Sequence, residues 1–191
     1  ETQAHWAVDI FVGASTPLDG FIETMIHWTV GKLGVQTIII AKDDFFGRTG
    51  KIFTDDEYYH QRMHYFLNTF LFDRPLSPTS HATPFSSFQE NSPLPCLIEG
   101  HLHSLFKVLK SKAGTLIVRD LFADKKIKIQ RQDQELFEGI TKGDIFQGFL
   151  LQQGVNAFLS RGLIFHPTPA HKIIARLLKT CKDPHRLEKD E

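Results

Sequence analysis

Residues 104–131 read "SLFKVLKSKAGTLIVRDLFADKKIKIQR", and this stretch decides the class of fold. Its three runs, "SLFKVLKSK", "TLIVRDLF" and "KKIKIQR", have the composition and the alternation of strands. The sequences between them, "AG" and "ADK", have lengths that suit tight hairpins. Two further runs, "KGDIFQGFLLQ" and "VNAFLSRGLIFHP", follow in residues 142–167. Five strands in this order predict a curved antiparallel sheet or a small five-stranded barrel.

The half of the chain that precedes this stretch carries helical signals. Thr16 followed by a proline predicts a helix over 17–33 with Thr16 as its cap. A second helix is predicted over 54–72, because Thr54 and Glu57 match the T-x-x-E capping box. It should end just before the proline that follows "DR", since the residue before a proline disfavours helix.

The remaining segments are shorter. Residues 5–14 predict a short strand or a buried extended segment, and the β-branched run "VQTIIIA" (35–41) predicts a strand or the end of a buried segment. A proline-rich connector with one short helix is expected over 76–96. The segment "TPAHKIIARLLKTCK" (168–182) places its apolar residues at helical spacing and predicts an amphipathic closing helix.

Composition agrees with one or two ordinary globular parts. The chain has 191 residues, is 41% hydrophobic, and carries 17 Phe, most of which we expect in a core. The predicted fold class is therefore α+β. Residues 1–96 form a helical part with the connector, and residues 97–191 form a β-rich part with the closing helix. We expect the two parts to pack together as one compact unit.

The stretch "HQRMH" (60–64) raises the question of a metal site. His60 and His64 lie four residues apart, which places both imidazoles on one helix face. The glutamate that a zinc protease needs after the first histidine is Gln61 here, so that mechanism is excluded. Two interpretations stay open: a non-hydrolytic metal site completed from elsewhere, or histidines at the margin of an apolar stripe.

The stretch "EGHLHS" (99–104) holds a second pair, His101 and His103. On a strand both imidazoles would share one face, as in some Zn and Fe sites. The alternative is a polar junction between a helix and a strand. If the four histidines converged, a zinc ion would be the expected cofactor; otherwise no cofactor is expected.

Basic residues suggest a third kind of site. They are spaced along two predicted strands and in the loop "GRTGK", which is a candidate anion nest: Lys107, Lys110 and Lys112; Lys125, Lys126 and Lys128; Arg48 and Lys51. A basic groove on a small barrel is typical of proteins that bind single-stranded nucleic acid. The alternative is that lysines mark the solvent side of strands and protect sheet edges. The net charge of zero favours that alternative.

Four segments together resemble an uncharacterised family of bacterial proteins: "GRTGKIFTDDEYYHQRMHYFLNTFLFDRPL" (47–76), "HSLFKVLKSKAGTLIVRDLF" (103–122), "GDIFQGFLL" (143–151) and "FHPTPAHKII" (165–174). The resemblance implies a helical half followed by a β-rich half. Because the family has no assigned activity, it implies no catalytic residues. Its pattern does not fix histidine at His60, His64 or His101, which counts against both metal sites.

These observations predict a binding or regulatory module without enzymatic activity. No nucleophile motif, phosphate loop or strong metal set is visible in the sequence. We expect a protein or a single-stranded nucleic acid as partner and no membrane association. The two cysteines form no disulfide framework, which predicts a cytoplasmic setting. The alternative function is a metal-dependent enzyme built on the four histidines.

Overall fold

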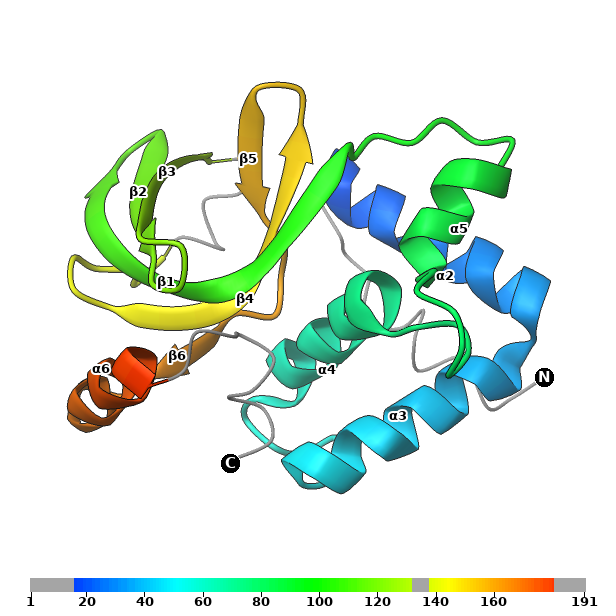
Figure 1. Cartoon of the computed structure of the whole chain (residues 1–191), viewed down its shortest axis with the longest axis horizontal. Coiled ribbons are helices and arrows are strands. Elements are labelled where there is room, and N and C mark those ends of the chain that lie inside the picture. Colours follow the sequence, from blue (N-terminus) through cyan, green and yellow to red (C-terminus); the bar gives the residue numbers. More distant parts are fainter. Residues whose placement is uncertain (1–15, 132–137, 181–191) are drawn as a thin grey trace. The chain divides into compact units, whose positions relative to one another are not determined.

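The computed structural model describes residues 16–131 and 138–180 and divides the chain into two compact units (Figure 1). The helical unit comprises Glu1–Ile98 together with Ser160–Gly162, and the barrel unit comprises Glu99–Leu159 and Leu163–Glu191. The strand predicted for residues 5–14 lies outside the described residues.

Five helical segments make up the described part of the helical unit: α2 (Pro17–Leu33), α3 (Val35–Thr49), α4 (Tyr59–Asn68), the π-helix η1 (Thr69–Asp73) and α5 (Pro84–Asn91). The predicted start of α2 is confirmed, because the Thr16 hydroxyl accepts a hydrogen bond from the backbone N–H of Asp19 at 3.1 Å. The short helix expected in the connector is α5. The second predicted helix ends as α4 passes into η1 ahead of the proline.

The strand predicted for residues 35–41 is wrong, since these residues open helix α3. Ile38, Ala41 and Phe45 are buried and lie three and four residues apart, which places them on one face of a helix. β-Branched residues lower helix propensity only slightly. Burial of this face therefore outweighs the local preference of the isoleucines for a strand.

The predicted capping box at Thr54 does not form. Residues 54–58 are turns, and α4 begins at Tyr59 without a side-chain cap. Asp56 caps the preceding turn instead, where its carboxylate accepts a hydrogen bond from the backbone N–H of Phe53 at 2.6 Å. This competing local hydrogen bond delays the start of the helix by about one turn.

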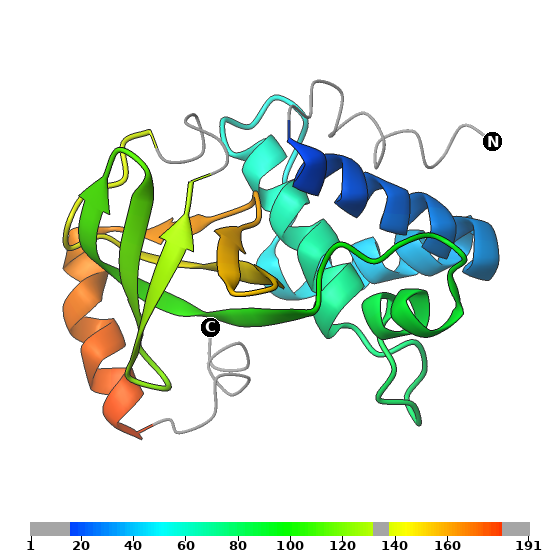
Figure 2. The same cartoon turned by 90° about the horizontal axis from the view of Figure 1, so that it is seen from above.

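Phenylalanine rings fill the interior of the helical unit, as the composition predicts. Phe88 of α5 meets Phe21 of α2 edge-on, with 5.6 Å between ring centroids. Phe45 of α3 contacts Phe66 of α4 at 5.4 Å, so each of these helices contributes rings to one core. Figure 2 shows these helices from above.

The described part of the barrel unit contains six strands: β1 (Gly100–Lys112), β2 (Thr115–Asp120), β3 (Lys125–Gln130), β4 (Ile145–Gln153), β5 (Asn156–Leu159) and β6 (Ile164–His166). Pairing runs β1-β2-β3-β5-β4 and closes through a β1–β4 ladder, while β6 pairs with β4. The predicted α+β fold with a small five-stranded barrel is therefore confirmed. The sheet is not wholly antiparallel, because β3 and β5 pair in parallel at Ile129 and Ala157.

The last predicted strand is split in two. Residues 160–162 leave the sheet between β5 and β6 and belong to the helical unit. The predicted closing helix follows as η3 (Thr168–Ala170) and α6 (His171–Thr180). Among the described residues, no helix is long and apolar enough to cross a membrane.

Candidate functional site

The outer face of strands β1, β2 and β3 carries the densest cluster of like charges that we identify among the described residues. The strands bury alternate residues in the barrel core, including Phe106, Val118 and Ile129. The residues between them point outward, because side chains alternate across a sheet. The β-bulge between Val108 and Lys110 keeps both ends of β1 in phase with this face.

Strand register arranges the outward positions in three rows. Lys107 pairs with Arg119, which pairs with Lys126. The second row is Lys110, Ile117 and Lys128, and the third is Lys112, Thr115 and Gln130. We call these nine residues the cationic face. Six of the nine positions are Lys or Arg, none is acidic, and the five lysines are exposed.

Few carboxylates balance this charge. The guanidinium of Arg119 lies 3.4 Å from the carboxylate of Asp124, and the two side chains are 42% and 80% exposed. Within residues 16–131 and 138–180, none of the five lysines forms an ion pair. The face can therefore hold several anionic groups at once.

Five of the six lysines that the sequence predicted on these strands lie on this face, and one does not. Lys125 pairs with Asp120 and shares the phase of the core positions, although its own side chain is exposed at the strand end. Sequence reasoning missed Arg119. The signal was present, since Arg119 and Ile117 share one phase of the alternation in "TLIVRD".

The two predicted anion-nest residues lie at the end of α3 in the helical unit. Gly50 closes this helix with a φ of 83°. Arg62 of α4 donates to the carbonyl oxygens of Thr49 and Gly50 at 2.8 Å and 3.0 Å. The loop between Arg48 and Lys51 thus presents its carbonyls to a cation of the same unit, which is a helix-end arrangement.

The two histidine pairs belong to different units. His60 and His64 lie on α4, and His101 and His103 lie on β1. His103 stacks on the ring of Phe149, with 4.1 Å between centroids. In the described part of the chain, no group of three or more His, Cys, Asp or Glu side chains is arranged to hold a metal ion.

His64 borders a polar network in the helical unit. Burial, and then the neighbouring Arg161 cation, lower the pKa of His64 to about 4, so the imidazole is neutral at pH 7. A neutral imidazole can bind a metal, but the cation of Arg161 would repel one. The sequence-based interpretation of a histidine at the margin of the core agrees with this position.

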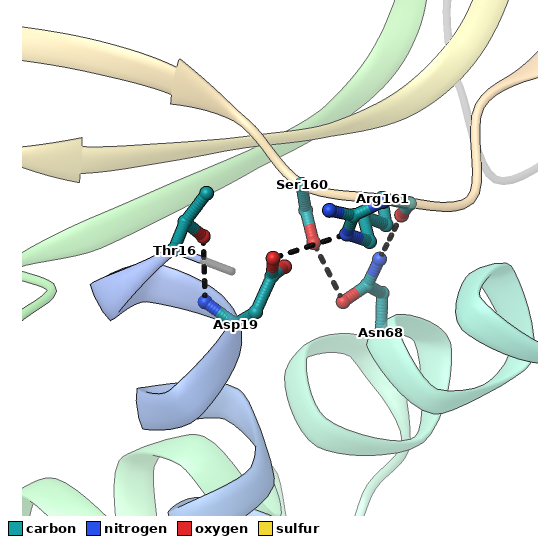
Figure 3. A network of polar contacts seen from close by, with 5 residues as sticks. All are labelled: Thr16, Asp19, Asn68, Ser160 and Arg161. Atoms are coloured by element: carbon teal, nitrogen blue, oxygen red, sulfur yellow. Dashed lines mark hydrogen bonds and ion pairs between the residues drawn. The ribbon is translucent and has the colours of Figure 1, made fainter. Parts of the chain in front are cut away.

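The network itself joins four residues that sequence reasoning did not connect. Figure 3 shows Asp19, Asn68, Ser160 and Arg161 pointing toward one another. Arg161 Nε donates to the carboxylate of Asp19 at 3.0 Å. Asn68 accepts from the Ser160 hydroxyl at 3.0 Å and donates to the Arg161 carbonyl at 2.7 Å. These contacts hold residues 160–162 against α2 and α4. The charges of Asp19 and Arg161 are paired with each other within the helical unit.

A hollow of about 450 Å³ lies on the helical unit, beside the proline-rich connector. Its lining is mostly apolar and includes Ile40, Phe70 and Leu76. The charged residue of the lining, Arg74, is already paired with the carboxylate of Asp44 at 2.7 Å. The hollow therefore lacks a group that would select the charge of a ligand.

Compared with known proteins, the chain matches no family model, no curated protein and no solved structure. The resemblance to the bacterial family stays a prediction.

Proposed function

We propose that this chain is a binding module that holds a polyanionic partner on the cationic face of its barrel unit. The single observation that carries the proposal is the row Lys107–Arg119–Lys126, where like charges lie directly opposite one another on neighbouring strands. Neighbouring strands are about 4.8 Å apart. Such pairs destabilise a sheet by roughly 0.2–1 kcal/mol each.

Protection of sheet edges is the main alternative explanation of the lysines. It suits Lys110 and Lys112, which lie beyond the β1–β4 ladder. It does not suit Lys107, which pairs with Arg119 on one side and with Ile145 on the other. It does not suit Arg119 either, because β2 is paired on both sides. A bound polyanion accounts for charges in the interior of the sheet as well as at its edge.

The proposal keeps the expectation of a non-enzymatic module in a cytoplasmic setting. It is supported by a face whose nine residues include six cations that can bind anionic groups. The metal-dependent enzyme built on the four histidines stays an untested alternative.

Chromatography on a sulfated polysaccharide tests the proposal, with a plain cation exchanger as reference. We expect the double variant Lys107→Gln/Lys126→Gln to elute at clearly lower salt than the wild type. The matched control, Lys125→Gln/Lys172→Gln, removes the same charge from exposed lysines that lie off the face. If both variants elute together, the face does not bind the polyanion and the proposal is wrong.

A further inference from the structure

We propose that the polyanion is a single-stranded nucleic acid, held through its phosphates and without sequence preference. This inference rests on the proposed function of the cationic face and names its ligand. Three properties of the face carry it: its residue composition, the kind of contact its side chains can make, and its width.

Composition distinguishes a nucleic acid from an acidic protein. Five of the nine positions are lysine, and Ile117 is the sole apolar residue among them. Interfaces between proteins are depleted of lysine and have an apolar or aromatic centre. Interfaces with nucleic acid are far more positively charged. The cationic face has the composition of an interface with nucleic acid.

Side-chain chemistry indicates contact with phosphates rather than with bases. Lysine is a point charge that binds phosphate oxygens without the planar fork that reads a base edge. Arg119 has such a fork, but one end of it lies 3.4 Å from the Asp124 carboxylate. None of the nine positions holds an aromatic ring on which a base could stack. Binding should therefore be independent of sequence.

Width favours a single strand over a duplex. The major groove of a duplex admits a helix or a two-stranded ribbon. The cations here spread over three neighbouring strands, so that the outer strands are about 10 Å apart before side chains are added. The strands are also curved (Figure 1). A flexible single strand can follow a broad curved face, whereas a rigid duplex would reach only part of it.

Fluorescence anisotropy with the full chain tests the inference. The probes are two labelled 20-nucleotide single strands of unrelated sequence, one 20-base-pair duplex and one 20-residue polyglutamate, titrated between 50 and 200 mM salt. If the six cations each neutralise one phosphate, the logarithm of the binding constant should fall with the logarithm of salt with a slope of about −4. Lys107→Gln/Lys126→Gln should reduce that slope by about 1.4, and Lys125→Gln/Lys172→Gln should leave it nearly unchanged.

Each outcome decides a different statement. Similar binding of both single strands, weaker binding of the other probes and the reduced slope would support the inference. Equal binding of polyglutamate, with the same dependence on Lys107 and Lys126, would overturn the inference that the ligand is a nucleic acid while leaving the proposed function intact. Tighter binding of the duplex would overturn the preference for a single strand. A tenfold difference in affinity between the two single strands would overturn the inference that binding is through phosphates alone. Binding of no probe would overturn both the inference and the proposed function.

Discussion

Charges are used in opposite ways in the two units of this protein. In the helical unit, Asp19 and Arg161 meet at 3.0 Å, and the side chain of Asp19 is only 6% exposed. In the barrel unit, the exposed Lys107 and Lys126 lie on either side of the half-buried Arg119, so that three like charges are neighbours. The first arrangement satisfies its charges within the fold. The second leaves its two lysines without an ion-pair partner among the described residues.

This difference separates charges that stabilise the fold from charges available for binding, in a protein whose net charge is zero. A count over the whole sequence hides the cationic face, because acidic residues elsewhere cancel it. Removing a residue from the inward network should cost stability. Removing a residue from the outward face should cost binding and leave stability equal or slightly higher. The following predictions test the two sides of this comparison.

The largest effect is expected at Gly162, which lies against α4. Its φ is +87°, and a Cβ there would approach the carbonyl carbon of His64 to 2.7 Å and collide with the backbone of Tyr65. Backbone strain and overpacking together predict that Gly162→Ala lowers the free energy of unfolding by about 4 kcal/mol. Urea denaturation measures this loss.

Gly154 provides a matched control for that substitution. It also has a positive φ, of 57°, but an added Cβ would meet nothing within 4 Å. Gly154→Ala should therefore cost only the conformational strain, about 1 kcal/mol. Equal losses for the two variants would show that residues 160–162 are not seated on α4 as described.

The next effect concerns acid stability and His64. Burial and the Arg161 cation lower the pKa of His64 from 6.5 to about 4 in the folded chain. Between these values the unfolded chain binds a proton that the folded chain does not, so stability falls as the pH falls from 6.5 to 4. The loss from this group should reach about 3 kcal/mol at pH 4 and should be absent above pH 6.5.

Denaturation of the His64→Gln variant at pH 7 and at pH 4.5 measures this contribution. The variant should lose less stability than the wild type over that interval, because glutamine does not titrate. His60→Gln, on the same helix at an exposed position, is the matched control for the substitution of a histidine by glutamine. A wild-type pH dependence that persists unchanged in His64→Gln would contradict the burial of a neutral imidazole.

A smaller loss is expected when the ion pair is broken. Asp19→Asn leaves Arg161 without its carboxylate partner in a largely buried site. A fully buried pair would cost more, but the Arg161 side chain is 26% exposed, so we expect a loss of about 2 kcal/mol. The double variant Asp19→Asn/Arg161→Met should recover part of this loss in urea denaturation. Simple additivity of the two single variants would exclude the coupling.

Much of the barrel could be predicted from sequence, because the alternation in residues 104–131 is local. Pairing between distant strands could not. The β1–β4 ladder joins residues 38 to 52 positions apart, from Lys107 and Ile145 to Gly100 and Gln152, and local patterns do not encode such contacts. The same limit hid the departure of residues 160–162 from the sheet. The structural sign of this departure is Gly162, whose backbone lies against that of His64 and Tyr65 on α4.

The candidate site shows the same division. The sequence alone grouped six lysines of two predicted strands on one face, among them Lys107, Lys126 and Lys128. Alternation along β3 already places Lys125 on the opposite face from Lys126 and Lys128. The row that joins Lys126 to Arg119 required the register of β3 against β2, which depends on the hairpin turn. The prediction of a strand over residues 35–41 was wrong for a related reason, because burial in the core and not local propensity decides that they are helical.

The smallest effect is also the one with an unusual sign. Lys126→Gln removes a like-charge neighbour of Arg119 and should raise the free energy of unfolding by about 0.5 kcal/mol at low salt. The adjacent Lys125 pairs with the buried Asp120, so Lys125→Gln should give no gain or a slight loss. Thermal unfolding at 20 mM and at 1 M salt measures both variants, and screening should remove the difference at high salt. If Lys126→Gln destabilises the protein at low salt, the cationic face contributes to folding, and its charges need no partner to account for them.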